Sequence, residues 1–229
     1  MILNKEIEST ALYMRLLPPF GIRISKKYLE KFQKPIKILD IGCGNHFVKK
    51  FYTQLGKEIK YTCIDKQIYN LDYEDLSLIN EFFIIDLEKS KIRDFIKDKF
   101  DFIYFSHVIE HLDNGYDVLR QLRELQNSGG VLYIETPSLK SLNLPHRKSS
   151  TLNFYDDPTH KKVYPLMKII STLEETGYKI IKYGYRRDYK RILIMPFGIL
   201  FFFISGKEIK GPLLWDILGF ANFVLAIAK

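Results

Sequence analysis

Three carboxylates follow successive apolar runs in the first half of the chain, and their spacing suggests a binding site. Asp40 lies two residues before the turn Gly42-Cys43-Gly44, Asp65 ends the next apolar run, and Asp86 ends the one after that. Glycines in a strand-to-helix turn let a ligand approach the backbone, and the N–H groups at a helix start attract anions. Asp40 is placed to meet a cationic amino group, and Asp65 to accept from ribose hydroxyls. Asp86, beside the apolar Leu87, is placed to accept from an adenine amino group. The set predicts a site for an adenosine joined to an amino acid.

The same turn excludes one common alternative. A dinucleotide fingerprint requires a third glycine at position 47, where this chain has Phe47. A lone Gly-x-Gly can also be a structural turn without a ligand. The spacing of the three acids favours the ligand site over the plain turn.

The histidines are the candidates for proton transfer. All five lie at the ends of expected strands or in a long loop, at His46, His107, His111, His146 and His160. Because histidine titrates near neutrality, it is the usual general base, although a structural hydrogen bond is the simpler role for any single one. We expect His111 and His160 to approach the reacting group from opposite sides, and His107, nearer the strand, to hold backbone.

The run from His107 to His111 also matches H-x-x-E-H, the inverted zinc-protease signature. Two histidines four apart on a helix could bind zinc, with Glu110 as the base. Here the run follows an apolar strand, and His107 precedes any clear helix start. We therefore predict no metal site, and a zinc hydrolase remains only as a remote alternative.

The elements that must position these residues alternate along the chain. Short β-branched and aromatic runs predict strands at 36–41, 60–65, 82–85, 100–106 and 131–135, with helices near 46–56, 73–80, 90–97 and 115–127. Further on we expect a helix at 165–176 and strands at 178–185 and 220–228. Alternating strands and helices imply a doubly wound, mostly parallel α/β sheet with helices on both faces, and ligands at the carboxyl ends of its strands.

Several of these pieces together resemble one family. Ile38 to Gly44, then Asp65, Asp86-Leu87, and the segment from Phe100 to Leu112 are similar, in order, to the class I S-adenosylmethionine-dependent methyltransferases. The resemblance implies a Rossmann-like sheet of seven strands whose final hairpin is reversed. It also implies S-adenosylmethionine as cofactor, with contacts from Asp40, Gly42, Cys43, Gly44, Asp65, Lys66, Asp86, Leu87, Ser106 and His107. Where the family often has a third glycine, this chain has His46.

A shorter segment bears on the methyl acceptor. Tyr155 to His160, followed by Tyr164, is similar to a segment of bacterial methyltransferases associated with glycan and lipopolysaccharide assembly. This resemblance implies O-methylation of a sugar or glycan intermediate, phosphorylated or lipid-linked, with Asp157 and His160, or His111, as catalytic residues. Asp-Asp-Pro is also a turn sequence in its own right. Another small molecule or a lipid as acceptor, and a non-catalytic cofactor-binding scaffold, are the alternatives.

Length and composition set the organisation of the chain. With 229 residues, 46% of them hydrophobic, it has one sizeable core to bury. We expect a helical extension over residues 1–34 and a methyltransferase domain over 35–229, with a substrate loop near 137–164 and an apolar insertion near 190–218. Two cysteines make no disulfide framework, and the start of the chain lacks the apolar run of a signal peptide, so we expect a cytoplasmic location.

Charge and hydropathy suggest what lies around the site. The net charge is +8, and it comes from basic flanks on either side of an acidic middle, which suits an anionic partner or simply solubility. The uncharged stretch 192–205 is too short to cross a bilayer, which needs about 20 apolar residues. It can be buried between the last two strands, an oligomer contact, or a peripheral contact with the inner membrane face. The sequence has no compact run of basic residues interleaved with aromatic ones, so we do not expect it to bind nucleic acid.

Overall fold

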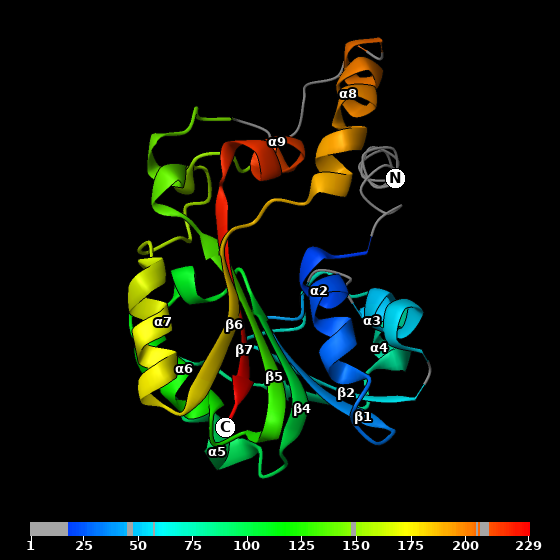
Figure 1. The fold of residues 1–229 in the computed structure, drawn as a ribbon, viewed down its shortest axis with the longest axis vertical. Helices are drawn as coiled ribbons and strands as arrows, with labels where there is room; N and C mark the ends of the chain where they lie inside the picture. The colour runs from blue at the N-terminus through cyan, green and yellow to red at the C-terminus, as the bar shows by residue number, and fades with distance from the viewer. Residues whose placement is uncertain (1–17, 45–47, 57, 148–149, 205, 207–210) are drawn as a thin grey trace.

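The architecture is a single seven-stranded sheet with helices on both faces (Figure 1). The computed structural model describes residues 18–229 except 45–47, 57, 148–149, 205 and 207–210. The strand order is β3-β2-β1-β4-β5-β7-β6. The strands are β1 (Ile36–Ile41), β2 (Ile59–Asp65), β3 (Glu81–Ile84), β4 (Phe100–Ser106), β5 (Gln126–Pro137), β6 (Tyr178–Tyr185) and β7 (Ala221–Ala228). The predicted doubly wound fold is confirmed.

The direction of the strands fixes where a ligand can bind. Strands β1 to β5 pair in parallel, whereas β7 is antiparallel to both β5 and β6. The central strands are almost continuously apolar because helices cover both of their faces. The strand order reverses between β1 and β4, so the crevice for a ligand lies at the carboxyl ends of these two strands.

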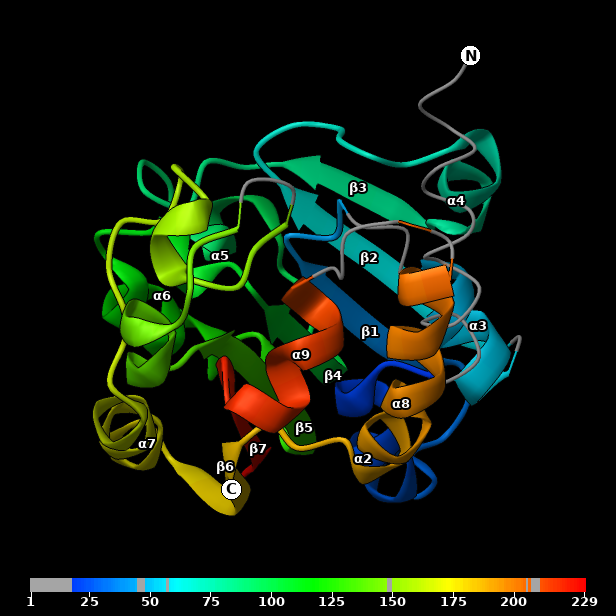
Figure 2. The ribbon, with the colours of Figure 1, turned by 90° about the horizontal axis from the view of Figure 1, so that it is seen from above.

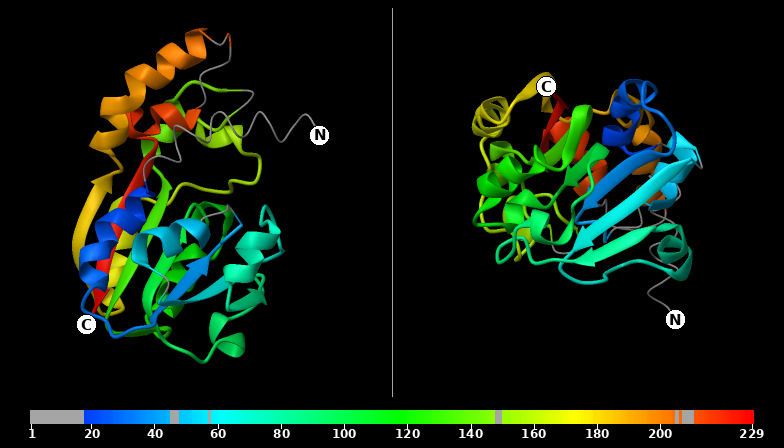
Figure 3. Two further views of the ribbon diagram at one scale, coloured as in Figure 1. Left: turned by 90° about the vertical axis from the view of Figure 1, so that its right-hand side faces the viewer. Right: turned by 90° about the horizontal axis from the view of Figure 1, so that it is seen from below.

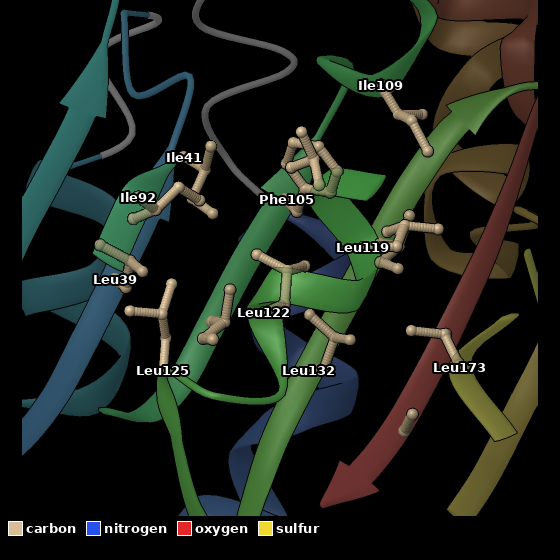
Figure 4. Close-up of a cluster of buried hydrophobic side chains, with 14 of the residues drawn as sticks. Leu39, Ile41, Ile92, Phe105, Ile109, Leu119, Leu122, Leu125, Leu132 and Leu173 are labelled. Carbon is tan, nitrogen blue, oxygen red and sulfur yellow. The ribbon is translucent and has the colours of Figure 1, made fainter. Parts of the chain in front are cut away.

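Two groups of helices cover the sheet (Figures 1 and 2). The helices on one face are α5 (Ile92–Phe95), α6 (Gly115–Leu122) and α7 (Leu166–Glu175), and those toward the other are α2 (Phe20–Leu29), α3 (Val48–Leu55) and α4 (Tyr73–Leu78). Figure 4 shows the larger core cluster, in which Leu119 and Leu122 of α6 meet Phe105 of β4 and Leu132 of β5, with Leu173 of α7 beside them.

Helix α2 lies within the helical extension expected over residues 1–34, although the sequence analysis gave no bounds for it. It begins directly after Pro19 and buries Ile22 and Leu29 in the second core cluster. Gly21 is required there, because a Cβ at this position would lie 2.3 Å from the Tyr133 ring. The first part of that extension, residues 1–17, lies outside the described residues.

The segment between β6 and β7 forms two helices, α8 (Tyr189–Ile204) and α9 (Gly211–Leu218). Helix α8 extends beyond the sheet (Figures 1 and 3). Several of its apolar side chains are exposed, with Leu193 78% and Phe203 84% accessible, although Phe202 is buried, so the burial expected for this segment between the last two strands is wrong for most of the helix. Within the described residues, the helices fall short of the length and apolarity needed to cross a membrane.

Candidate active site

A cavity of about 710 Å³ opens at the carboxyl ends of β1, β2 and β4. Two regions of the chain form opposite parts of its wall. The glycine turn after β1 and the ends of β2 and β3 supply Gly42, Gly44, Asp65, Lys66, Asp86 and Leu87. The segment after β4 and the loop before α7 supply His107, Val108, His111, Leu112, Asp157 and Thr159. The structure therefore brings most of the predicted site residues to one cavity.

The glycine turn is packed too closely for side chains. Gly42 has a φ of +75°, and a Cβ there would lie 2.2 Å from Cγ2 of Val108. A Cβ on Gly44 would lie 2.9 Å from the backbone oxygen of Tyr69 and 3.2 Å from Oδ2 of Asp65. Glycine at both positions keeps the backbone open to the cavity.

Asp65 and Asp86 are held by the backbone that follows them. Oδ1 of Asp65 accepts from the Lys66 amide at 2.7 Å, and Oδ1 of Asp86 accepts from the Glu88 amide at 3.0 Å. The Glu88 hydrogen bond and the neighbouring Lys89 lower the pKa of Asp86. Both carboxylates thus present fixed acceptors to a ligand, with Leu87 as an apolar neighbour.

Three predicted cofactor residues do not line this cavity as the described residues form it: Asp40, Cys43 and Ser106. Asp40 is buried at the end of β1, where its carboxylate accepts a hydrogen bond from the Tyr61 hydroxyl. Burial, with a smaller contribution from the charge of Asp65, raises the pKa of Asp40 to about 7 despite that hydrogen bond. His46, at the expected position of a third glycine, lies outside the described residues.

His107 is the centre of a buried chain of charges. Its φ is +55°, and its Nδ1 and Nε2 contact Oε1 of Glu110 at 3.1 Å and Oε1 of Glu135 at 3.0 Å. Glu135 in turn accepts from Arg186 at 2.8 Å, and Arg186 pairs with Asp216 at 2.9 Å. Burial disfavours the charged imidazole, but the hydrogen bonds with the two glutamates outweigh it and raise the pKa of His107 to about 9.

This network corrects two readings of the H-x-x-E-H run. We expected His107 to hold the backbone by hydrogen bonds, but both of its ring nitrogens contact carboxylates instead. Residues Ile109–His111 form a short 3-10 turn rather than an α-helix that presents His107 and His111 on one face. The zinc-protease arrangement is therefore not formed.

His111 and His160 lie side by side, with ring centroids 4.9 Å apart. The expectation that they face each other across the reacting group is wrong, because this separation leaves no space for a substrate between the rings. Nδ1 of His111 lies 3.1 Å from the Thr159 carbonyl oxygen, and Nδ1 of His160 lies 2.6 Å from the Phe154 carbonyl oxygen. Burial lowers the pKa of His160, which favours its neutral, proton-accepting form.

Asp157 is the third catalytic candidate, and it lies at the same corner of the cavity. Its Oδ1 accepts from the Thr159 amide at 2.8 Å and from the Thr159 hydroxyl at 2.6 Å. Its Oδ2 lies 3.8 Å from Nε2 of His160. His111 and Asp157 therefore line the cavity, whereas His160 lies behind them with 5% of its side chain accessible and is not among the lining residues.

Sequence reasoning missed the supporting charges, Glu135, Arg186 and Asp216, and gave Glu110 a role only in the rejected zinc site. Glu135 ends a buried strand at the same edge as Asp65 and Asp86, and that position was a usable signal. Arg186 and Asp216 become its neighbours only through the pairing of β6 and β7, which no local pattern indicates.

The strand order, the reversed final hairpin and a cavity at the switch point together define a class I methyltransferase fold. A family model described as a methyltransferase domain matches residues 13–183, so the chain belongs to this family.

Individual relatives agree with this assignment. The chain is 25% identical over 107 residues to a ubiquinone biosynthesis O-methyltransferase from Histophilus somni, and the match covers 44% of each protein. A SAM-dependent methyltransferase from Archaeoglobus fulgidus has a similar fold, with a TM-score of 0.57, 19% identity, and coverage of 95% of this chain and 93% of that one. The plantazolicin methyltransferase BpumL, solved in complex with SAH, gives a TM-score of 0.58 at 19% identity, over 100% of this chain and 89% of that one. The chain spans less than half the length of the curated relatives it matches.

Proposed function

We propose that the protein transfers a methyl group from S-adenosylmethionine to a hydroxyl group. The observation that carries this proposal is a single cavity with adenosine-binding acids, Asp65 and Asp86, on one part of its wall and His111 with Asp157 on another. Such an arrangement holds the acceptor close to the sulfonium methyl and in line with the sulfur. Positioning of this kind contributes up to roughly 7–11 kcal/mol to a reaction barrier at its limit.

In the proposed reaction the acceptor oxygen attacks the methyl carbon, the bond from carbon to sulfur breaks, and S-adenosylhomocysteine leaves. The acceptor proton passes to a base at the corner formed by His111, Asp157 and His160. His111 and Asp157 line the cavity and can accept it directly. His160 lies behind them; burial lowers its pKa and so keeps it neutral, and two carboxylates lie near its Nε2. An imidazolium formed there would be stabilised by Glu110 and Asp157.

We propose a sugar or glycan intermediate as the acceptor. The support is the loop from Tyr155 to Tyr164, which resembles that of glycan-associated methyltransferases and places Asp157 and Thr159 at the cavity wall. An acceptor of this kind offers several hydroxyls, and the polar side chains of the loop suit it. The curated relative from Histophilus somni is named as an O-methyltransferase, which is consistent with oxygen as the acceptor atom.

We also propose that α8 rests on a membrane surface and presents a lipid-linked acceptor to the cavity. The apolar side chains at positions 193, 197, 200, 203 and 204 are all more than half exposed. Arg187 and Lys190, both exposed, precede them and suit anionic headgroups. Helix α8 packs on α9, whose Trp215 donates to the backbone of Thr151 at the cavity wall, so the apolar surface is connected to the site.

Calorimetry with S-adenosylhomocysteine tests the cofactor site directly. We expect wild-type protein to bind it at micromolar concentration and Asp65→Ala to bind it at least about tenfold more weakly, since a ribose hydrogen bond to a charged group contributes about 1.5–3 kcal/mol. Absence of binding, or equal binding by the variant, overturns the assignment. Incubation with labelled cofactor and a pool of cell-extract glycans then separates an enzyme from a non-catalytic scaffold, because a scaffold binds cofactor and transfers nothing.

A further inference from the structure

We infer that Glu110, His111 and His160 form a binding site for a divalent first-row transition-metal ion, at the acceptor side of the cavity. One ligand atom from each of the three lies within 4.8 Å of the others. The inference rests on the proposed function in one respect, namely that the acceptor binds at this corner. It revises the expectation of no metal site, which concerned the pair His107 and His111; here His160, from a distant loop, replaces His107.

The hydrogen bonds of the two histidines prepare them as ligands. A carbonyl oxygen only accepts, so Nδ1 of His160 must carry the proton that it donates to Phe154. Nδ1 of His111 faces both the carbonyl and the hydroxyl of Thr159, and because that hydroxyl donates its proton to Asp157, this nitrogen is a donor as well. In the neutral rings Nε2 then keeps its lone pair. A backbone carbonyl on the second nitrogen is the usual support of a histidine that ligates a metal, because it fixes the tautomer and the ring orientation.

The carboxylates complete the donor set. Oε1 of Glu110 lies 4.0 Å from Nε2 of His160, and Oδ2 of Asp157 lies 3.8 Å from the same atom. These distances exceed a hydrogen bond, yet two oxygens from different segments converge on one nitrogen. Ligands with bonds of about 2.0–2.2 Å lie roughly 3.3–3.6 Å apart around a tetrahedral ion, so atoms up to 4.8 Å apart must approach one another by up to about 1.5 Å to close the site.

Glu110 is unusually well fixed for this purpose. Its side chain is fully buried, Oε2 accepts from the Thr136 hydroxyl at 3.2 Å, and Oε1 contacts His107. A buried carboxylate needs compensating charge, and His107 supplies part of it from one side. A cation between Glu110 and the two histidines would supply the rest from the other side.

The donor types decide which ion fits. Two imidazoles with one or two carboxylates suit Zn²⁺, Fe²⁺ or Mn²⁺, whereas Mg²⁺ and Ca²⁺ prefer oxygen ligands alone. His111 and Asp157 line the cavity, so a remaining coordination position would face the acceptor. An ion in this place would act as a Lewis acid that lowers the pKa of the acceptor hydroxyl. With the lone pairs of both histidines on the ion, the acceptor proton would pass to Asp157 instead of a histidine.

The test uses tag-free, full-length protein treated with a chelator and then titrated with Co²⁺ and, separately, Zn²⁺. We expect one ion per chain, seen for Co²⁺ as visible absorption bands, and displacement of Co²⁺ by Zn²⁺. Loss of a supporting partner alone weakens metal sites by about 10–100-fold, so His160→Ala and Glu110→Gln should weaken binding at least that much. The matched control is His146→Ala, which removes an exposed histidine paired with Asp156 on the same loop.

The outcomes separate this inference from the proposed function. Absence of Co²⁺ and Zn²⁺ binding by wild-type protein at micromolar concentration, or equal binding by wild type and His160→Ala, overturns the metal site. Weakening by His146→Ala equal to that by His160→Ala also overturns it, because binding would then be non-specific. Because Glu110→Gln can fail to fold, circular dichroism and S-adenosylhomocysteine calorimetry accompany every variant. Cofactor binding without metal binding leaves the methyltransferase proposal intact, whereas failure of cofactor binding by wild type overturns only that proposal.

Discussion

Asp40 illustrates how a single buried side chain makes the stability of this fold depend on pH. Burial raises the pKa of its carboxyl to about 7 from a model-compound value of 3.8. Since the folded state holds this proton more tightly than the unfolded state, the stabilisation is complete below about pH 4 and is lost as the pH rises toward 7. The penalty of an ionised, buried carboxylate then persists at higher pH.

We therefore expect Asp40→Asn to flatten this dependence. Asparagine retains an oxygen that can accept from the Tyr61 hydroxyl but does not ionise. Urea unfolding between pH 4.5 and 7.5 should show the free energy of unfolding of wild type falling more steeply than that of the variant, by up to about 1.4 kcal/mol per pH unit. Parallel curves for the two proteins would show that Asp40 does not titrate in this window.

The histidine pair His111 and His160 allows a second prediction at the residue scale. His111→Ala and His160→Ala should each lower turnover by about 10²–10⁴, the usual contribution of a general base, with cofactor affinity nearly unchanged. His146→Ala is the control, since His146 is exposed and outside the cavity. His107→Ala is not a suitable control, because it would leave Glu110 and Glu135 buried without their shared partner. If both single variants keep more than half of wild-type turnover, the histidine role is wrong.

How far the sequence predicts such a site depends on where each residue lies. Asp65 and Asp86 could be placed from the sequence because Asp65 ends β2 and Asp86 closely follows β3, and the carboxyl ends of parallel strands meet at one edge. The proximity of His111 and His160 could not, because it depends on the path of the loop before α7. The charges around His107 come from β5, β6 and α9, elements whose packing no local period reveals.

At the scale of elements, buried strands were the most predictable part of the fold. The bounds of β1 and β4 match the prediction, because helices on both faces of the sheet demand continuous apolar runs. Strand β5 begins earlier than predicted, because the polar and glycine residues from Asn127 to Gly130 lack the apolar pattern of a strand. The exposure of α8 was not predicted. Its residues 192–204 are uncharged and carry no hydrophobic periodicity that shows which side of the helix is exposed.

The ion pairs of Arg186, which directly follows β6, with Glu135 of β5 and Asp216 of α9 tie these elements together, and their loss should lower the stability of the fold. Both carboxylates are buried, so Arg186→Met would leave two charges without their partner. We expect the free energy of unfolding, measured by urea denaturation, to fall by about 3–5 kcal/mol.

The matched control for that change is Arg120→Met, which breaks a largely exposed pair with Asp117. A pair of that kind contributes less than about 1 kcal/mol. Equal losses for the two variants would show that the buried pair does not tie these elements together. A smaller loss for Arg186→Met than for Arg120→Met would contradict the prediction outright.

At the scale of the whole molecule, α8 differs from the sheet and its helices in how much apolar surface it exposes. The sheet and its helices bury most of their apolar side chains in two core clusters. Helix α8 extends from the molecule (Figure 3), and several of its apolar side chains are accessible. Exposed apolar groups on this scale mark interaction surfaces. Arg187 and Lys190, at the start of α8, suit an anionic surface, and α9 links α8 to the cavity wall through the hydrogen bond from Trp215 to Thr151.

Binding to lipid vesicles distinguishes this surface from ordinary solubility charge. We expect the protein to sediment with vesicles that contain anionic phosphatidylglycerol, and less with neutral phosphatidylcholine, with weaker binding at high salt because screening reduces the attraction. Phe197 and Phe203 are 72% and 84% exposed, and burying a phenylalanine contributes about 1.5–3 kcal/mol, so replacing both with serine should weaken binding at least about tenfold. Phe95→Ser is the control, since Phe95 is also exposed but lies on α5, within the sheet-covering layer. Equal binding by the double variant and by wild type would assign the apolar face of α8 to something other than a membrane.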